Sequence, residues 1–401
     1  MYKHMDKIKS RVDEIFDEVV AFRRELHMHP ELSEEESGTA TRIQEKLEAI
    51  GVACKTGVAG HGVVGTIYGQ NKDHAVGIRA DIDALPIDEQ TAFEFKSQVP
   101  GIMHACGHDI HTAILYGTAK ILSEIKDDLP GSVKLFFQPS EETVGGAKPM
   151  IDEGCLQNPD VKSVLGLHVE STIPAGSVMF TPGPMNAASC EFYVTVNGKS
   201  CHGAHPDAGV DPLVPACNMV TALQSIITRR LDPAETGLIT VGQFHSGTKN
   251  NVIPGETKFS GIIRTLNLAN RNLIKAEIEK TCTGIAMAHG ATCTVEFHDS
   301  YPSLENDDQL FDWVKTVSAE LLGDDKIHVV AKPSLGADDF SYFCHESRGL
   351  YYMIGTGLTD GRESFPIHSE FFNPDEECIR VGILTEVAAA LKILQEESQT
   401  W

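Results

Sequence analysis

The sequence predicts an α/β fold in which a larger domain with a mostly parallel sheet is interrupted by a smaller, ferredoxin-like α+β domain. The chain has 401 residues, which is long for one domain. Helical and strand patterns alternate through its first half, as they do in α/β proteins with parallel sheets. The pattern changes near Ala187 and returns after residue 301. We therefore assign residues 1–186 and 302–401 to the larger domain and residues 187–301 to the insertion.

Hydrophobic spacing predicts the elements of the larger domain. Apolar residues from Ile8 to Leu26 recur every three or four positions, as on one face of a helix. The same spacing from Ala40 to Ile50 predicts a second helix, which Gly51 ends. Short apolar runs predict strands around a third helix: strands over 63–68, 75–78, 133–137 and 161–167, and a helix over 110–121. Residues that follow parallel strands gather at one edge of the sheet, where α/β proteins place functional groups.

The insertion is predicted to contain six elements in the order β-α-β-β-α-β, which is that of a ferredoxin-like unit. They are strands over 192–196, 238–244, 259–263 and 293–297, and helices over 212–230 and 273–287. The pattern of the larger domain then returns with a helix over 310–322, a strand over 350–354 and a long helix from Asp375.

The composition argues against several classes of partner. A net charge of -24 opposes binding to nucleic acid or to an anionic membrane, because both need clustered Lys and Arg. No apolar run approaches the roughly 18 residues of a membrane span. Residues 1–7 lead into a charged amphipathic pattern rather than a signal peptide. The ten cysteines lack the spacing of a disulfide framework, so we expect a cytoplasmic protein with reduced thiols.

The densest chemical signal is the pair Cys106 and His108, which follows an acidic turn at Asp81 and Asp83. Thiolate and imidazole both bind transition metals. Alternate residues of an extended stretch point to the same side, so that these two side chains can hold one ion. An isolated Cys-x-His is more often a buried thiol beside a surface histidine. The pair therefore needs further ligands before it indicates a metal site.

Two adjacent carboxylates, Glu141 and Glu142, follow the apolar strand predicted over 133–137. Adjacent carboxylates repel each other, and one would resist ionisation without a nearby cation. A metal bound by one glutamate, with the other acting as an acid–base group, resolves this conflict. On its own, such a pair is usually a solvated loop or a helix start.

Two distant histidines complete the set. His168 closes the strand predicted over 161–167, and His368 lies in the segment Pro366-Ile367-His368-Ser369. Each alone has an ordinary structural explanation. Taken together, one cysteine, three histidines and two glutamates at strand ends form the set expected for two divalent ions.

In these motifs the sequence resembles the metallo-amidohydrolase family that contains aminoacylase and zinc carboxypeptidases. Within it, the closest resemblance is to the branch of hippurate hydrolases and auxin-conjugate (IAA-amino acid) hydrolases. The matching segments run in order over nearly the whole chain: residues 24–31, 79–86, 103–109, 138–142, 166–168, 251–254, 336–341 and 368–372. The resemblance implies a catalytic metal-binding domain interrupted by a dimerisation domain that serves as a lid, in agreement with the pattern of elements.

The resemblance also implies roles for individual residues. Glu141 would be the general base. In the wider family a histidine stands at the position of Asp81. Aspartate at this position is what the branch that uses Cys-x-His is expected to have. The implied metal ligands are Cys106, His108, Glu142, His168 and His368.

The insertion supplies the remaining implied residues. His202 would stabilise the charge that develops on the substrate oxygen, with His205 in the same loop as the alternative. Asn251 and Arg264 would contact the substrate carboxylate, for which a guanidinium offers paired donors. For Arg264 a structural salt bridge is the alternative.

These observations predict a metal-dependent amidohydrolase that splits the linear amide of small N-acyl amino acids, releasing a carboxylic acid and a free amino acid. The cofactor would be two divalent ions per subunit (zinc, manganese, cobalt or nickel), and the protein would be a homodimer through the insertion. Three alternatives stay open at this point: a metal-dependent carboxypeptidase or dipeptidase, an amidase with Cys106 as nucleophile, and a non-catalytic metal-binding dimer.

Overall fold

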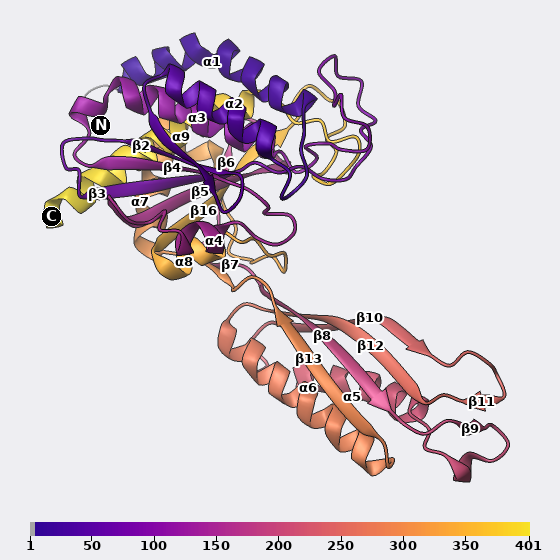
Figure 1. The fold of residues 1–401 in the computed structure, drawn as a ribbon. Coiled ribbons are helices and arrows are strands. Elements are labelled where there is room, and N and C mark those ends of the chain that lie inside the picture. Colours follow the sequence, from indigo (N-terminus) through magenta and orange to yellow (C-terminus); the bar gives the residue numbers. More distant parts are fainter. Residues whose placement is uncertain (1–4) are drawn as a thin grey trace. The chain divides into compact units, whose positions relative to one another are not determined.

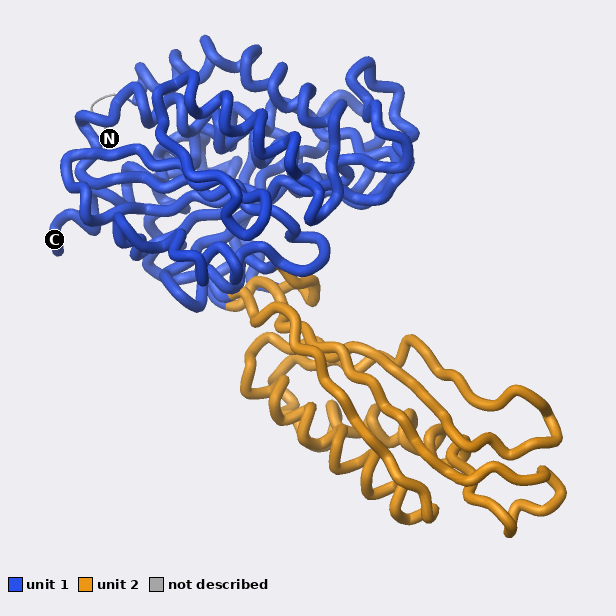
Figure 2. The backbone as a smooth tube through the Cα atoms, in the orientation of Figure 1, with its two compact units in different colours: residues 1–183, 305–332, 339–401 blue, residues 184–304, 333–338 orange. Residues whose placement is uncertain are grey.

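The computed structural model describes residues 5–401, and Figure 1 shows their helices and strands. The chain divides into two compact units (Figure 2). Unit 1 comprises residues 1–183, 305–332 and 339–401, and unit 2 comprises residues 184–304 and 333–338. The prediction that no signal peptide is present concerns residues 1–7, and residues 1–4 lie outside the described part of the chain.

The segment 333–338 belongs to unit 2, whereas the hydrophobic pattern placed it in the larger domain. Backbone hydrogen bonds explain the difference, because Ser334 N donates to Met185 O at 2.8 Å and Ala187 N donates to Gly336 O at 2.8 Å. These pairings carry no hydrophobic periodicity and therefore leave no signal in the sequence.

Unit 1 is built on an eight-stranded sheet in the order β1-β2-β4-β3-β5-β16-β6-β15. Its strands are β1 (Ala53–Val58), β2 (Gly62–Ile67), β3 (His74–Asp81), β4 (Ser132–Gln138), β5 (Asp160–Pro174), β6 (Val178–Phe180), β15 (Ile327–Val329) and β16 (Arg348–Gly357). The central strands β4, β3, β5 and β16 are parallel, and β15 is parallel to β6. The predicted α/β class is confirmed, but the sheet is mixed, because β1, β2 and β6 pair antiparallel with their neighbours.

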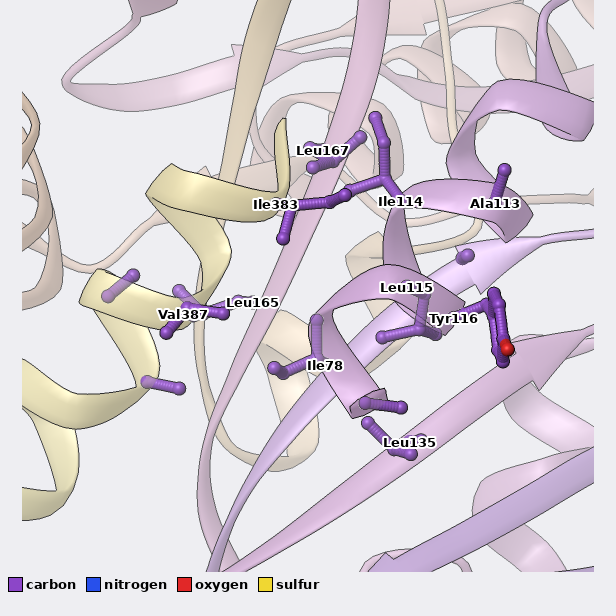
Figure 3. Packing of buried hydrophobic residues seen from close by; sticks show 14 of the residues in the cluster. Ile78, Ala113, Ile114, Leu115, Tyr116, Leu135, Leu165, Leu167, Ile383 and Val387 are labelled. Atoms are coloured by element: carbon purple, nitrogen blue, oxygen red, sulfur yellow. The ribbon is translucent and has the colours of Figure 1, made fainter. Parts of the chain in front are cut away.

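Helices cover the sheet of unit 1. Those with bounds in this unit are α1 (Met5–Met28), α2 (Ser37–Ala49), α3 (His108–Glu124), α4 (Ala147–Asp152), α7 (Asp308–Leu322), α8 (Ser341–Glu346) and α9 (Glu377–Glu397). Figure 1 shows α1, α2 and α3 on one side of the sheet and α4 and α8 on the other. The core between helices and sheet is apolar, and Ile114 of α3, Leu167 of β5 and Ile383 of α9 lie together in it (Figure 3). Burial of such side chains is the main stabilising contribution to the unit.

Unit 2 has the predicted ferredoxin-like order, with a four-stranded antiparallel sheet arranged β10-β12-β8-β13. Its main elements are β8 (Ala188–Asn197), α5 (Leu213–Arg229), β10 (Gly237–Ser246), β12 (Glu256–Thr265), α6 (Leu268–Ala288) and β13 (Thr292–Asp299). A short pair, β9 (Cys201–His202) and β11 (Val252–Ile253), forms a separate small sheet. The two strands β7 (Gly183–Asn186) and β14 (Leu304–Asn306) include the unit boundaries.

Helix α6 starts five residues earlier than its hydrophobic pattern predicts. Asn267 precedes the helix, and its side chain accepts a hydrogen bond from Asn270 N at 2.8 Å. This cap satisfies one of the N–H groups that lack an intrahelical partner, so the helix extends beyond its apolar stripe. Among residues 5–401, no helix is long and apolar enough to cross a membrane.

Candidate metal centre

The carboxyl ends of the central strands position the candidate site. Asp81 ends β3 and Gln138 ends β4, so that the loops after these strands start at the same edge of the sheet. His168 was expected to close its strand, but β5 continues to Pro174. The pairing of β3 with β5 stops at Gly166, so His168 lies just beyond the last residue that β3 covers.

Cys106 and His108 are brought together by a turn and not by an extended strand. His108 is the first residue of α3, and Gly107 before it has a left-handed conformation with φ 86°. A Cβ atom at Gly107 would lie 2.6 Å from Val169 Cγ2, which also excludes a side chain there. The Cys-x-His spacing therefore works because glycine turns the chain between the two residues.

The five predicted ligands form two groups of three that share Cys106. Within each group, the candidate ligand atoms all lie within 4.8 Å of one another. The groups are Cys106, His108 and His168, and Cys106, Glu142 and His368. Cys106 Sγ lies 3.3 Å from Nε2 of both His168 and His368. Sulfur and nitrogen ligands on one tetrahedral zinc ion would be roughly 3.6 Å apart, so these separations suit a common ion.

Hydrogen bonds fix the orientation of two of these imidazoles. His168 Nδ1 lies 2.8 Å from Val169 O, and His108 Nδ1 lies 2.9 Å from Asp83 O. A carbonyl oxygen accepts, so each Nδ1 carries a proton and each Nε2 faces away from that bond. Burial would lower the pKa of His108, but Asp81 and Cys106 hold it well above its ordinary value, so a metal ion at Nε2 would take the place of a proton. His108 Nε2 and Glu142 Oε1 are buried and have no hydrogen-bond partner among the described residues. Two electron-pair donors buried in this way fit a cation between them.

Asp83 holds two of the ligands at once. Its Oδ1 lies 3.1 Å from His108 Nδ1, and its Oδ2 accepts from Glu142 N at 3.0 Å and from Ser33 Oγ at 2.8 Å. Burial alone would raise the pKa of Asp83, but these bonds and the neighbouring His108 hold it below its ordinary value. Asp83 therefore remains an acceptor for all three groups.

His111 was missed by the sequence reasoning, although it lies close to Asp81 and His108. Its Nε2 accepts from Val169 N at 3.0 Å, and its Nδ1 lies 2.5 Å from Asp81 Oδ1. Burial lowers the pKa of His111 to about 4, so the ring is neutral and uses both nitrogens in hydrogen bonds. We assign it a structural role, linking β3 to β5 beside His168. The available signal was its place in the helix predicted over 110–121, three residues after His108, because residues three apart on a helix lie on the same face.

Asp81 occupies the position at which the resembling family has a histidine. Arg79 Nη1 donates to Asp81 Oδ2 at 2.6 Å, and Arg79 Nη2 donates to Asp339 Oδ1 at 2.9 Å. Burial would raise the pKa of Asp81, but His108, Arg79 and His111 hold it well below its usual range. The carboxylate is thus engaged by Arg79 and His111, and it neutralises part of the positive charge beside the site.

Glu141 lies next to the second group. It is 8 % exposed, and its carboxylate lies within 4.8 Å of the candidate ligand atoms of His108 and Glu142. Burial would raise the pKa of Glu142, but His368 and His108 hold it below its ordinary value. Two carboxylates and two imidazoles therefore meet here, as expected for an acid–base group beside a metal ligand.

The environment of Cys106 opposes a role as nucleophile. The thiol is 6 % exposed, and burial raises its pKa well above its ordinary value, although the neighbouring His108 acts in the other direction. A reactive cysteine needs the opposite shift, because the thiolate is the nucleophile. Binding to a metal would supply the missing positive charge.

Unit 2 carries the other three predicted residues in two places. His202 in β9 is paired with Val252 of β11, so exposed Asn251 lies beside His202, and Gly203 N donates to Asn251 O at 2.8 Å. His202 is exposed, and its Nδ1 accepts from Ala204 N at 3.0 Å. These groups follow the end of β8 and precede the start of β12.

Arg264 lies in the four-stranded sheet and not in the small sheet of β9 and β11. It is opposite Ser189 near the start of β8, whereas Glu256 at the start of β12 is opposite Asn197. The eight steps from Glu256 to Arg264 span about 26 Å along the strand. Arg264 Nη1 is buried without a hydrogen-bond partner among the described residues, and burial lowers its pKa. Unit 2 therefore does not bring Arg264 together with His202 and Asn251.

Comparisons of the sequence and of the fold with known proteins each match most of this chain. Residues 77–392 match the sequence profile of Peptidase family M20/M25/M40. The chain is 38% identical over 392 residues to thermostable carboxypeptidase 1 of Saccharolobus solfataricus, covering 97% of this chain and 98% of that protein. It is 41% identical over 305 residues to an N-acyl-L-amino acid amidohydrolase of Geobacillus stearothermophilus, covering 76% and 82%. A dinuclear metal binding peptidase of Bacillus subtilis superimposes with a TM-score of 0.83 at 30% identity, covering 96% and 99%.

Proposed function

Because this chain belongs to Peptidase family M20/M25/M40, we propose that it uses two divalent metal ions to hydrolyse the amide bond of small N-acyl amino acids. The chain is a hydrolase that acts on amides, as its amidohydrolase relatives indicate. The observation that carries the proposal is the pair of ligand groups that share Cys106, with Glu141 beside them. The products would be a carboxylic acid and a free amino acid.

The proposed ligands are Cys106, His108, Glu142, His168 and His368, and Cys106 belongs to both candidate groups. Their mixture of one thiolate, one carboxylate and three imidazoles suits zinc, while manganese, cobalt and nickel also accept this set. When bound, the ions would acidify water and polarise the amide carbonyl.

The chain's own residues would perform the proton transfers. Glu141 would take the proton of the attacking water and return it to the leaving amine, which is the role of a general acid–base group. Its burial beside Glu142 and His108 supports this role, because bulk water is largely excluded around the carboxylate. Asp83 would keep His108 and Glu142 in place during the reaction.

Unit 2 would provide contacts to the substrate. His202 would donate to the developing oxyanion, since its Nδ1 accepts a backbone hydrogen bond and Nε2 then carries the proton. Asn251 and Arg264 would bind the substrate carboxylate. His202 follows the end of β8 that lies opposite the start of β12, whereas Arg264 lies about 26 Å along β12 from that start, which is more than a small substrate spans. This separation supports a homodimer in which the two ends that serve one substrate come from different copies.

Two alternatives differ in substrate or chemistry. The carboxypeptidase relative favours hydrolysis of small peptides as the second candidate. Small peptides and N-acyl amino acids both contain an amide and a carboxylate. They differ in the group on the carbonyl side of the amide, so preference for that group distinguishes the two candidates. The raised pKa of Cys106 argues against the cysteine-nucleophile alternative. A cytoplasmic location and the absence of nucleic-acid and membrane partners stay predictions.

A substrate screen tests the proposal. Protein stripped with a chelator is reloaded with zinc, manganese, cobalt or nickel and given N-acetyl, N-benzoyl and N-indolylacetyl amino acids beside dipeptides. Release of free amine is then measured. We expect turnover of at least one N-acyl class and none in the stripped protein. Turnover of dipeptides alone would replace the proposal with the carboxypeptidase alternative.

A further inference from the structure

Ser140, the residue directly before Glu141, has a left-handed backbone conformation with φ 60°. This conformation is unfavourable for residues other than glycine, because Cβ approaches the following carbonyl oxygen. Such a residue persists where its surroundings determine it, and it is frequent at active sites. Ser140 is buried, so protein contacts and not solvent must hold it.

Glu36 is the side chain that holds Ser140. Glu36 Oε1 accepts from Ser140 N at 2.8 Å and from Ser140 Oγ at 3.2 Å. Glu34 N in turn donates to Ser140 Oγ at 2.9 Å. Glu36 is fully buried, and its Oε2 has no hydrogen-bond partner among the described residues. The buried carboxylate of Glu36 thus accepts both of these hydrogen bonds from a single residue, Ser140, which is the neighbour of Glu141.

The local helix does not require Glu36. Glu36 stands directly before α2, yet its side chain makes no capping bond to the helix. Glu31 performs the capping, because its carboxylate accepts from Gly38 N at 3.0 Å and from Thr39 N at 2.6 Å. Since the exposed N–H groups of α2 are bound by Glu31, the carboxylate of Glu36 is available for Ser140.

Close packing limits the turn on its other sides. A Cβ atom at Gly146 would lie 2.0 Å from Pro139 O, and one at Gly62 would lie 3.1 Å from Pro139 Cδ. Gly145 N donates to Ser140 O at 2.8 Å. The peptide before Glu141 therefore has little room to move while Glu36 is in place.

We propose that Glu36 is a positioning residue that sets the direction of the Glu141 carboxylate by holding Ser140 in its left-handed conformation. The proposal rests on the proposed role of Glu141 as general base. It does not extend to Glu142, because Asp83 holds Glu142 N separately at 3.0 Å. Loss of Glu36 should therefore affect catalysis and leave metal binding unchanged.

Three variants test this on the metal-loaded protein. Glu36→Ala removes the acceptor and should lower kcat about 100-fold, the effect of displacing a reacting group by about 1 Å. KM, bound metal and the midpoint of thermal unfolding of the purified variant are measured beside it, and KM and metal should stay unchanged. Glu36→Gln keeps an oxygen acceptor for Ser140 and should restore most of kcat. Glu35→Ala changes an exposed neighbour on the same loop and serves as the matched control.

A second substitution separates positioning from general damage. Ser140→Gly in the Glu36→Ala background should recover part of the lost kcat, because glycine adopts a left-handed conformation without the steric cost. If Glu36→Ala is insoluble, Glu36→Asp carries the test, since its shorter carboxylate cannot reach Ser140 N in the same geometry. An unchanged kcat in either soluble variant overturns the proposal, and so does an equal loss in Glu36→Gln.

A crystal structure of Glu36→Ala gives a readout that does not depend on activity. Ser140 should leave the left-handed region and Glu141 should shift, while Glu142 and Asp83 stay in place. If the wild-type protein hydrolyses no N-acyl amino acid, the proposed function fails, and this structure still decides the role of Glu36. Unchanged positions of Ser140 and Glu141 would refute that role.

Discussion

The proposed chemical groups of unit 1 and the proposed substrate groups of unit 2 differ in how firmly they are held. In unit 1, His108 is buried and Glu142 is half-buried, and both share Asp83 as a partner, while His368 is exposed. In unit 2, His202 and Asn251 are exposed, and Arg264 has a nitrogen without a partner among the described residues. We therefore expect the proposed groups of unit 1 to be organised before substrate arrives and those of unit 2 to complete their bonds on binding.

The largest effect should come from the base. Glu141→Gln removes the proton acceptor and leaves the proposed ligands intact, so kcat should fall about 100- to 10,000-fold while bound metal stays near normal. Stopped assays of amine release and elemental analysis of the same preparation measure both quantities. A variant that keeps most of its kcat would remove Glu141 from the base role and weaken the contrast between the units.

The next largest effect should come from the proposed ligands. Cys106→Ser and His368→Ala should each lower bound metal as well as activity, because a direct ligand is lost. Cys217→Ser, which changes an exposed thiol in unit 2, is the matched control and should keep both. Full metal occupancy in both site variants, by elemental analysis, would show that the ligands are others.

Substitution of His202 should have a smaller effect that falls on kcat more than on KM. Loss of an oxyanion donor costs about 100-fold or more in rate, and His205→Ala is the matched control in the same loop. Mixing Glu141→Gln with His202→Ala subunits tests the dimer. Recovered activity means that His202 serves the neighbouring copy, and no recovery in confirmed mixed dimers means that it acts in its own. A scattering mass of one chain would contradict the dimer.

The smallest effect concerns a buried acid of unit 1 outside the site. Burial raises the pKa of Glu386 in α9 to about 8, although a hydrogen bond from Thr118 Oγ1 acts in the other direction. The folded protein therefore retains this proton more tightly than the unfolded chain. The contribution of this group to the free energy of unfolding is complete below pH 4.5. It falls by about 1.4 kcal/mol per pH unit between pH 4.5 and pH 8.

Glu386→Gln should remove that loss, so denaturant unfolding of the variant should show a flatter decline between pH 5 and pH 8. Activity should be unchanged, because Glu386 is a buried residue of α9 that accepts from Thr118 of α3 and belongs to neither candidate ligand group. An equal slope in variant and wild type would mean that Glu386 is ionised in the fold.

Hydrophobic periodicity was enough to predict most elements and the class of the fold. It failed where hydrogen bonds determine the structure. Examples are the assignment of residues 333–338 to unit 2 and the start of α6, which Asn267 caps. The candidate site was predicted from residue types that are costly to bury without a cation, such as adjacent Glu141 and Glu142. The supporting residues had no such signal, since Glu36 and His111 are ordinary polar residues until tertiary contacts give them partners.

The order of the strands in the sheet has a consequence for how the protein forms during synthesis. Strand β16 lies between β5 and β6, yet it is translated after all of residues 184–304. The unit 2 segment is nearly continuous in sequence and can fold while the sheet of unit 1 still lacks its central strand. His368 lies further along the chain than β16, so the site acquires its last proposed ligand at the end of synthesis. Until then the nascent chain exposes the unpaired edges of β5 and β6, and this interval is when aggregation should compete most strongly with folding.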